Sequence, residues 1–208
     1  MDRFFNPRSV AVIGASNSPF NLGSTICRAL SEYSPYDGNV YAVNRKGETV
    51  HGCPGYVSVM DMPETVDLAV IITPAKVVPD FVRQCGEKGI RRIVIESSGF
   101  SEGGEEGRAM QHDIDETARR YDMRIMGPNC LGVLNTKNKF CCFYGIQEDN
   151  FDMFIQDKGS ISYVIQSGGI VVIVLESFAG DVVGVNKIVS IGNKCDIDEA
   201  DMLEYFDS

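Results

Sequence analysis

The sequence has 208 residues but no tryptophan, and its only two histidines are His51 and His112. It contains no apolar run of about 18 residues, the length that a membrane-spanning helix needs. The first residues lack the apolar core of a secretory signal. No CxxC pair occurs, so a zinc site of that spacing is not expected, and we predict no bound metal. Together these absences predict a cytoplasmic protein without a membrane segment.

Positive charge is also scarce. The chain has 19 basic and 29 acidic residues and a net charge of -10, which argues against a nucleic-acid partner. An anionic ligand needs only local positive groups and is not excluded. The seven cysteines are an odd number without a signal peptide, which predicts reduced thiols. Cys141 and Cys142 lie between two phenylalanines, and we interpret them as small apolar residues that pack in the core rather than as a disulfide.

The first two thirds of the chain alternate short apolar runs with helical patterns. Strands are predicted at 10–13, 39–43, 68–72, 92–95 and 124–126, and the main helices at 24–32, 77–88 and 105–121. Such alternation implies right-handed crossovers between parallel strands. The sequence therefore predicts a Rossmann-like α/β domain with a parallel sheet.

Each predicted strand is followed by small or polar residues: GAS, NRK, TPA, SSGF and GPNC in turn. Ligands of open parallel sheets bind outside the carboxyl ends of the strands, where these loops gather. The first loop runs from Gly14 to Gly23 and leads into a helix, an arrangement suited to phosphate because glycine permits close approach to the backbone. It is not a GxGxxG motif. The five loops nevertheless predict a nucleotide-binding domain.

The loop after the second strand indicates the kind of nucleotide. An NAD site has an acidic residue here for the ribose hydroxyls, whereas this chain has Asn44, Arg45 and Lys46. Positive charge favours a ligand with a phosphate on the adenosine ribose, such as NADP or coenzyme A. The other interpretation is an ordinary solvated basic turn.

The sequence pattern changes at residues 137–158. This region is rich in aromatic and acidic residues and has no clear hydrophobic periodicity, and we interpret it as an excursion or linker. A second unit follows at 159–208, with strands at 161–165 and 188–191 and helices at 170–179 and 198–206. Two parallel strands cannot cover their own faces. We therefore expect domains at 1–136 and 159–208, with the second belonging to a longer protein.

Several strings now show a specific similarity. They are VIGAS with Gly23, YAVNRK, ITPA, SSGF, GPNCLG, QSGG and GNKCDIDEAD. In this order they resemble the coenzyme A-binding domain of the NDP-forming acyl-CoA synthetases, a family that includes the succinyl-CoA synthetase alpha subunit. The resemblance covers nearly the whole chain except 137–158. It implies a Rossmann-like coenzyme A-binding domain followed by the start of a flavodoxin-like α/β domain.

The resemblance also implies site residues. Those expected around the coenzyme A phosphates are Gly14, Ala15, Ser16, Asn21, Leu22 and Gly23, with Asn44 and Lys46 near the nucleotide phosphate. Those expected along the ligand are Thr73, Pro74 and Ala75, then Ser97, Ser98 and Gly99 at the pantetheine arm, and Asn129 and Cys130 at the thiol end. A phosphohistidine loop would contain Ser167, Gly168, Gly169 and Asn193. Arg45 departs from the family, which often has proline before the lysine. For Cys130 we favour packing over a nucleophilic role.

The implied reaction converts an acid, ATP and coenzyme A into acyl-CoA, ADP and phosphate through a phosphohistidine. The nucleotide, Mg²⁺ and an ATP-grasp subunit or domain belong to the full-length protein, and a homo-oligomer is compatible with the family. We expect the phosphorylated histidine beyond Ser208, so this chain supplies no catalytic residue and is inactive alone. His51 and His112 are interpreted as surface or structural side chains.

Two alternatives remain open. One is a coenzyme A-sensing regulatory module of a larger protein, such as an acetyltransferase fusion. The other is an NADP-binding oxidoreductase domain, although GxGxxG and a catalytic pair are missing. The regulatory and synthetase interpretations cannot be separated here, because the deciding histidine and the ATP-grasp portion are not in the sequence.

Overall fold

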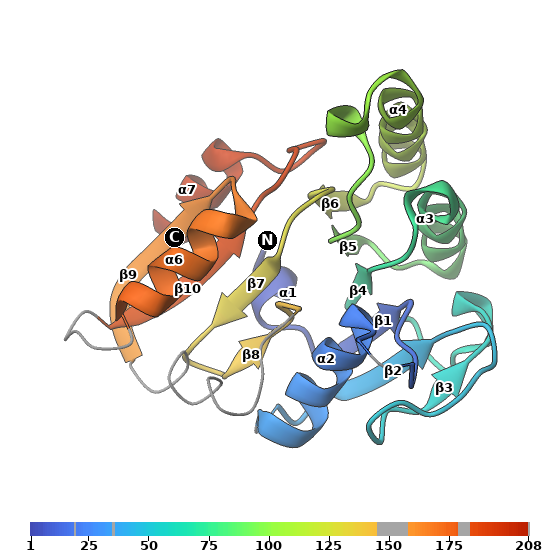
Figure 1. Ribbon diagram of the computed structural model, residues 1–208, viewed down its shortest axis with the longest axis horizontal. Helices are drawn as coiled ribbons and strands as arrows, with labels where there is room; N and C mark the ends of the chain where they lie inside the picture. The colour runs from blue at the N-terminus through green and yellow to red at the C-terminus, as the bar shows by residue number, and fades with distance from the viewer. Residues whose placement is uncertain (19, 35, 145–157, 179–183, 208) are drawn as a thin grey trace.

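The computed structural model describes residues 1–18, 20–34, 36–144, 158–178 and 184–207, and Figure 1 shows their arrangement. Two β-sheets lie side by side, one of six strands and one of four. The order in the first sheet is β3-β2-β1-β4-β5-β6, and in the second β8-β7-β10-β9. Among the described residues, no helix is both long and apolar enough to cross a membrane.

The first sheet is parallel throughout. Its strands are β1 (Ser9–Ile13), β2 (Asn39–Val43), β3 (Gly55–Tyr56), β4 (Leu68–Ile71), β5 (Arg92–Ile95) and β6 (Arg124–Met126). β1 lies between β2 and β4, with Val10 opposite Val40 on one side and Leu68 on the other. The expected Rossmann-like parallel sheet is confirmed. The edge strand β3 was not predicted, because two residues carry no periodic signal.

Alternation along β1 gives the sheet two buried faces. Ala11 and Ile13 face the helices α3 (Val78–Lys88) and α4 (Glu105–Arg120), where Val82 and Ile114 complete the core. Figure 1 shows these two helices together on that side. The opposite face receives α2 (Leu22–Arg28), which continues without a break into the π-helical turn η1 (Ala29–Tyr33). Short 3-10 turns complete the connections at η2 (Val59–Asp61), η3 (Ala75–Val77) and η4 (Ser101–Gly103).

The second sheet has more strands than expected. The predicted pair is present as β9 (Lys158–Ile165) and β10 (Val185–Ser190), which are parallel. β7 (Gly132–Asn135) and β8 (Phe140–Cys141) join them with antiparallel pairing, β7 directly beside β10. The expectation of a two-stranded unit was therefore wrong, because β7 follows the GPNCLG loop without a break and β8 is only two residues long. Residues 145–157 of the expected linker lie outside the described residues.

The two sheets share one apolar core. Val94 and Met126 of the first sheet belong to the same buried cluster as Val133 and Val189 of the second. The terminal helices α1 (Asp2–Phe5) and α7 (Glu199–Asp207) close this cluster, with the rings of Phe5 and Tyr205 stacked at 5.1 Å.

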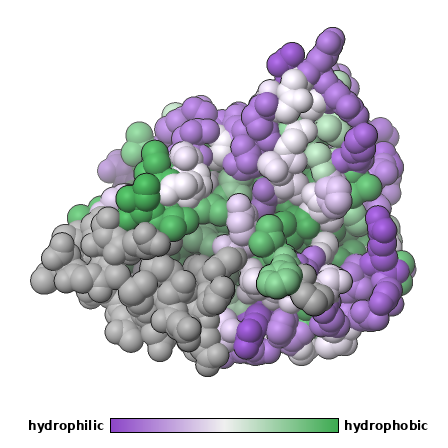
Figure 2. Space-filling model, in the orientation of Figure 1, coloured by the Kyte–Doolittle hydropathy of each residue, from purple (hydrophilic) through white to green (hydrophobic). Residues whose placement is uncertain are grey.

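Helix α6 (Gly168–Phe178) covers the other face of the second sheet through Val171. Its outer face exposes Ile170, Val172 and Ile173. Figure 2 shows the resulting apolar patch over α6.

The segment after β10 returns to the first sheet. The N–H groups of Asn193, Cys195 and Ile197 donate to the carbonyls of Pro128, Gly127 and Ile125, at 2.8, 3.0 and 3.1 Å. This segment runs along the edge of the sheet beside β6. It brings the GNK loop of the second unit to the carboxyl end of β6.

Candidate ligand-binding site

The five loops predicted from the sequence lie next to one another. Backbone N–H groups link neighbouring strand ends in a series: Gly14 to Val43, Ile72 to Ile13, Glu96 to Ile71 and Asn129 to Ser97, at 2.8 to 3.0 Å. Because the strands are parallel, all these carboxyl ends lie at the same end of the sheet, which we call the strand-end edge. The expected ligand residues of the first domain are thus gathered on a single edge, although their individual roles remain predictions.

Asn21 organises the β1–α2 loop. Its Oδ1 accepts from the N–H of Ser16 at 2.9 Å and of Ser24 at 2.8 Å, and its Nδ2 donates to the carbonyl of Gly14 at 3.1 Å. It is the N-cap of α2. These bonds occupy the Asn21 side chain within the loop, so Asn21 fixes the backbone of the loop.

Gly14 and Gly23 are required by close packing. A Cβ on Gly14 would lie 2.3 Å from the carbonyl oxygen of Ile72, and the residue has a φ of 104°. A Cβ on Gly23 would lie 2.8 Å from the Cα of Ala15. Both glycines therefore let α2 and the end of β4 approach the loop. The close approach of a phosphate to this backbone, for which the sequence analysis valued the glycines, stays a prediction.

The loop exposes two apolar side chains beside its polar ones. Leu22 is 45% exposed and Phe20 is 99% exposed. The sequence analysis did not single out Phe20, although an isolated aromatic residue within a polar glycine loop is a usable signal. Phe20 has a φ of 63°, a conformation uncommon for a bulky side chain and most often found at turns or functional sites.

The β2 loop is a turn built on Asn44. The Nδ2 group of Asn44 donates to the carbonyl of Glu48 at 2.8 Å, and Oδ1 accepts from the N–H groups of Lys46 and Glu48 at 3.2 and 3.0 Å. Lys46 projects from this turn with 76% of its side chain exposed, and its Nζ lies 3.4 Å from the Glu48 carboxylate. An exposed ion pair of this kind contributes little stability, so Lys46 can turn toward an anion at small cost.

The loops after β4 and β5 hold each other. The N–H of Thr73 donates to the Ser97 hydroxyl at 2.9 Å, and that hydroxyl lies 3.4 Å from the Ile71 carbonyl. The N–H of Gly99 donates to the Glu102 carboxylate at 2.5 Å, which holds the pKa of Glu102 below its usual range against the opposing effect of burial. Pro74 and Ser98 are exposed, whereas Ala75 and Gly99 are half-buried. The exposed residues of these two loops form the surface along which the pantetheine arm was expected to run.

Residues of the second unit meet this edge. Nδ2 of Asn129 lies 3.4 Å from Oδ1 of Asn193, and Nδ2 of Asn193 lies 2.5 Å from the Glu102 carboxylate. Glu102 was not predicted as a site residue, because acidic residues at a helix start are common without a function. Asn129, at the expected thiol end, and Asn193, of the expected phosphohistidine loop, therefore belong with Glu102 to one polar network.

The QSGG string joins the carboxyl end of β9 to α6, which begins at Gly168. The carbonyl of Ser167 accepts from Ile170, while Gln166 Nε2 donates to the carbonyl of Gly192 at 3.2 Å. A Cβ on Gly168 would lie 3.0 Å from Leu131 Cγ, so this turn packs against the residue after Cys130. The expected residues Ser167, Gly168, Gly169 and Asn193 are therefore close to the β6 end.

Cys130 is 3% exposed, and its thiol lies 3.3 Å from the carbonyl of Ile95. Burial raises the pKa of this thiol, with a further contribution from the nearby Glu96 carboxyl. A protonated, enclosed thiol is a poor nucleophile. This is the packing role that the sequence analysis favoured.

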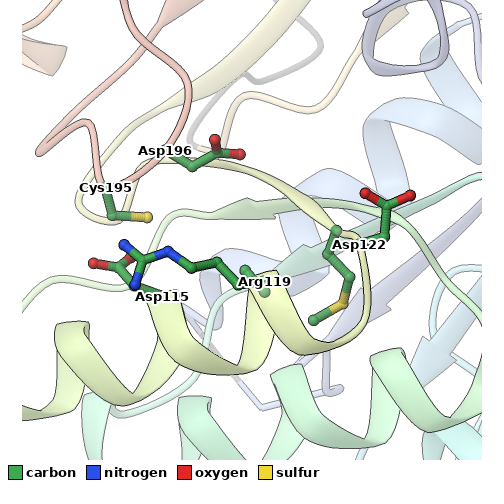
Figure 3. A pocket seen from close by; sticks show the side chains of 7 residues that line it. Asp115, Arg119, Asp122, Cys195 and Asp196 are labelled. Carbon is green, nitrogen blue, oxygen red and sulfur yellow. The ribbon is translucent and has the colours of Figure 1, made fainter.

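A separate recess of about 360 Å³ lies between the second half of α4 and the segment at Cys195 (Figure 3). Figure 3 shows Arg119 reaching toward Asp115, with Cys195 and Asp196 on the segment that crosses α4. Three aspartates and one arginine supply its charge. This net acidic lining disfavours a phosphate-bearing ligand in the recess.

Comparison with known proteins identifies the two parts of the chain. Residues 8–136 match the family described as CoA binding domain, and residues 158–208 match the succinyl-CoA ligase like flavodoxin domain. The chain is 43% identical over 205 residues to an acetate–CoA ligase [ADP-forming] I of Archaeoglobus fulgidus, covering 99% of this chain and 28% of that protein. It is 40% identical to the alpha subunit of acetate–CoA ligase [ADP-forming] II of Pyrococcus furiosus, covering 99% of this chain and 43% of that subunit.

A solved structure shows the same arrangement. The apo acetyl-coenzyme A synthetase 1 of Ca. Korarchaeum cryptofilum superposes with a TM-score of 0.90 at 33% identity, covering 100% of this chain and 43% of that one. The chain thus spans less than half the length of these relatives. These matches confirm the similarity inferred from the strand-end motifs and favour it over the oxidoreductase and sensing-module alternatives. The chain belongs to the family of CoA-binding domains, within the group that contains the ADP-forming acetyl-CoA synthetases.

Proposed function

We propose that this chain is the coenzyme A-binding portion of an NDP-forming acyl-CoA synthetase. The observation that carries the proposal is the edge where five strand-end loops meet, in a chain belonging to the CoA-binding domain family. The complete protein would convert an acid, ATP and coenzyme A into acyl-CoA, ADP and phosphate. It would need Mg²⁺, an ATP-grasp subunit or domain and a phosphorylated histidine.

The expected residues suit the parts of the ligand. The Asn21-ordered loop with Gly14 and Gly23 offers a closely packed backbone for the diphosphate, and Lys46 offers a mobile cation for the ribose phosphate. The exposed β4 and β5 loops would run along the pantetheine arm. The Asn129–Asn193 contact would then place the thiol beside the second unit, where the phosphohistidine loop is proposed.

We propose the same division of the chain as before, with units at 1–136 and 159–208 joined by 137–158. The matched ranges of the two families support it. The pairing of β7 with β10 means that the first unit contributes a strand to the sheet of the second. A cytoplasmic location is also proposed, since all seven cysteines are free thiols.

The first test is ligand class. In isothermal titration calorimetry, we expect coenzyme A to bind the chain, and desulfo-coenzyme A to bind with similar affinity, because most polar contacts would involve phosphates. NAD and NADP are expected to bind more weakly. Stronger binding of NAD than of coenzyme A would contradict the proposal, because NAD lacks the ribose phosphate that Lys46 is proposed to bind.

The second test concerns Lys46. Replacing Lys46 by alanine should weaken coenzyme A binding by about 1–3 kcal/mol, the effect of losing a hydrogen bond to a charged group. The loss should shrink for 3'-dephospho-coenzyme A if the ribose phosphate is the partner. Arg83→Ala is the matched control, since it removes an exposed, paired cation from α3. Equal losses for both ligands would exclude the ribose phosphate as the partner of Lys46.

A further inference from the structure

His51 connects two segments that border the strand-end site. It lies in the loop between β2 and β3 with a φ of 46°. Its Nε2 is 3.0 Å from the Ser24 hydroxyl in α2, and its Nδ1 is 2.9 Å from the Glu32 carboxylate in η1. The imidazole is thus held at both nitrogens, which is more constraint than a surface histidine requires.

The charges around the ring fix its hydrogen-bond pattern. Glu32 also accepts from Arg28 at 2.9 Å, and this bond, followed by the bond to His51, holds the pKa of Glu32 below its usual range. The remaining titratable groups nearby are the thiols of Cys53, 3.9 Å from the His51 carbonyl, and of its neighbour Cys27. An ionised Glu32 can only accept, so Nδ1 of His51 carries a hydrogen in either charge state.

The charge of His51 therefore decides what the Ser24 hydroxyl can do. In the neutral ring, Nε2 is an acceptor, and the Ser24 hydroxyl must donate to it. In the protonated ring, Nε2–H donates to the Ser24 oxygen, and the hydroxyl hydrogen is released for another acceptor. Histidine is the side chain that makes this change between about pH 5 and 8.

Ser24 lies in the first turn of α2, beside the loop where the ligand diphosphate is proposed to lie. Its N–H shares Asn21 Oδ1 with the N–H of Ser16, and it follows Gly23 directly. Ser24 is half-buried. Neither Ser24 nor His51 carried a role in the sequence analysis.

We propose that His51 is a positioning residue that couples phosphate binding to proton uptake. Protonation of His51 turns the Ser24 hydroxyl into a donor for a diphosphate oxygen and adds a positive charge behind it. By linkage, diphosphate binding then draws a proton onto His51. This inference rests on the proposed coenzyme A function, because it needs a diphosphate at the β1–α2 loop.

The test is calorimetric titration with 3'-dephospho-coenzyme A between pH 6 and 8, in buffers that differ in ionisation enthalpy. This ligand is chosen because the ribose phosphate of coenzyme A itself titrates near pH 6. We expect net proton uptake and an affinity about three- to tenfold higher at pH 6 than at pH 8, within the tenfold-per-unit limit for one proton. Binding without proton uptake would overturn the inference and leave the proposed function intact. No binding at all would remove both.

Two variants and one control locate the proton. His51→Asn, whose side chain tolerates positive φ but is too short to bridge the two partners, should bind with a pH-independent affinity. Ser24→Ala should lose most of the pH dependence, and retention of the full dependence would contradict the role of Ser24. His112→Gln is the matched control, because His112 also contacts a glutamate, Glu116 at 3.4 Å, but on the exposed face of α4.

A second measurement is independent of binding strength. With only two histidines in the chain, their ring resonances can be followed by nuclear magnetic resonance and assigned with His112→Gln. Saturating 3'-dephospho-coenzyme A should move the titration of His51 to higher pH and leave that of His112 in place. A downward or absent shift of His51 would contradict the inference.

Discussion

Replacing Gly14 by alanine is expected to lower the free energy of unfolding by about 2–5 kcal/mol and to weaken coenzyme A binding at least about tenfold. The added Cβ would lie 2.3 Å from the Ile72 carbonyl oxygen and 2.8 Å from Thr73 Cγ2. The first of these atoms is backbone and cannot rotate away. The φ of 104° adds strain for any L side chain.

The loss of binding follows from what this backbone carries. The N–H of Gly14 bonds to Val43, and its carbonyl accepts from Asn21, so displacement of Gly14 disturbs three strand-end loops at once. Urea denaturation and calorimetry measure the two effects. Gly103→Ala in η4 is the control, because a Cβ there meets nothing within 4 Å. Equal stability of the two variants would show that the β1 and β4 ends are not packed as described.

The central strands could be predicted from sequence because each contains a short apolar run. β2 and β5 have the predicted bounds, and β4 differs by one residue. Buried parallel strands need apolar residues on both faces, which gives a signal that turn residues then delimit. β3 and β8 were missed because strands of two residues carry no periodic signal, and β7 was missed because its pairing with β10 joins residues about fifty positions apart.

The sequence could predict where the candidate site lies, but it predicted the roles of the individual residues less well. Small and polar residues after each strand identified the edge. The sequence could not show that Asn21 and Asn44 have their side chains occupied by their own loops. Nor could it reveal His51, whose partners Ser24 and Glu32 are 27 and 19 residues away. Such contacts arise from the crossing of the β2–β3 loop over α2, which no local pattern records.

The sequence analysis gave no role to Glu96. Among the residues it left without a role, Glu96 has the largest expected effect on stability. It directly follows β5 and precedes the SSGF string. The structure places it on the same face as Val94, between the two sheets, with 4% of its surface exposed. Neither carboxylate oxygen has a hydrogen-bond partner among the described residues. Its surroundings are Cys130, Cys142 and the backbone of Gly132.

Burial raises the pKa of Glu96 well above its usual value, because a charge in this position loses its hydration without gaining a partner. The folded protein therefore keeps a proton that the unfolded chain releases near pH 4.3. Between those two pKa values the folded state binds more protons, so stability must fall as pH rises. The slope is at most about 1.4 kcal/mol per pH unit for one proton.

We expect Glu96→Gln to remove this slope. Its free energy of unfolding, relative to that of the unsubstituted chain, should increase steadily from pH 5 to pH 8 in urea denaturation under reducing conditions. Glu96→Leu should behave likewise and avoids an unpartnered amide in the core. Glu87→Gln, at an exposed position of α3, is the control and should give a constant difference. Parallel curves for Glu96→Gln and the unsubstituted chain would mean that Glu96 is ionised in the folded state, and hence that a partner or water reaches it between the sheets.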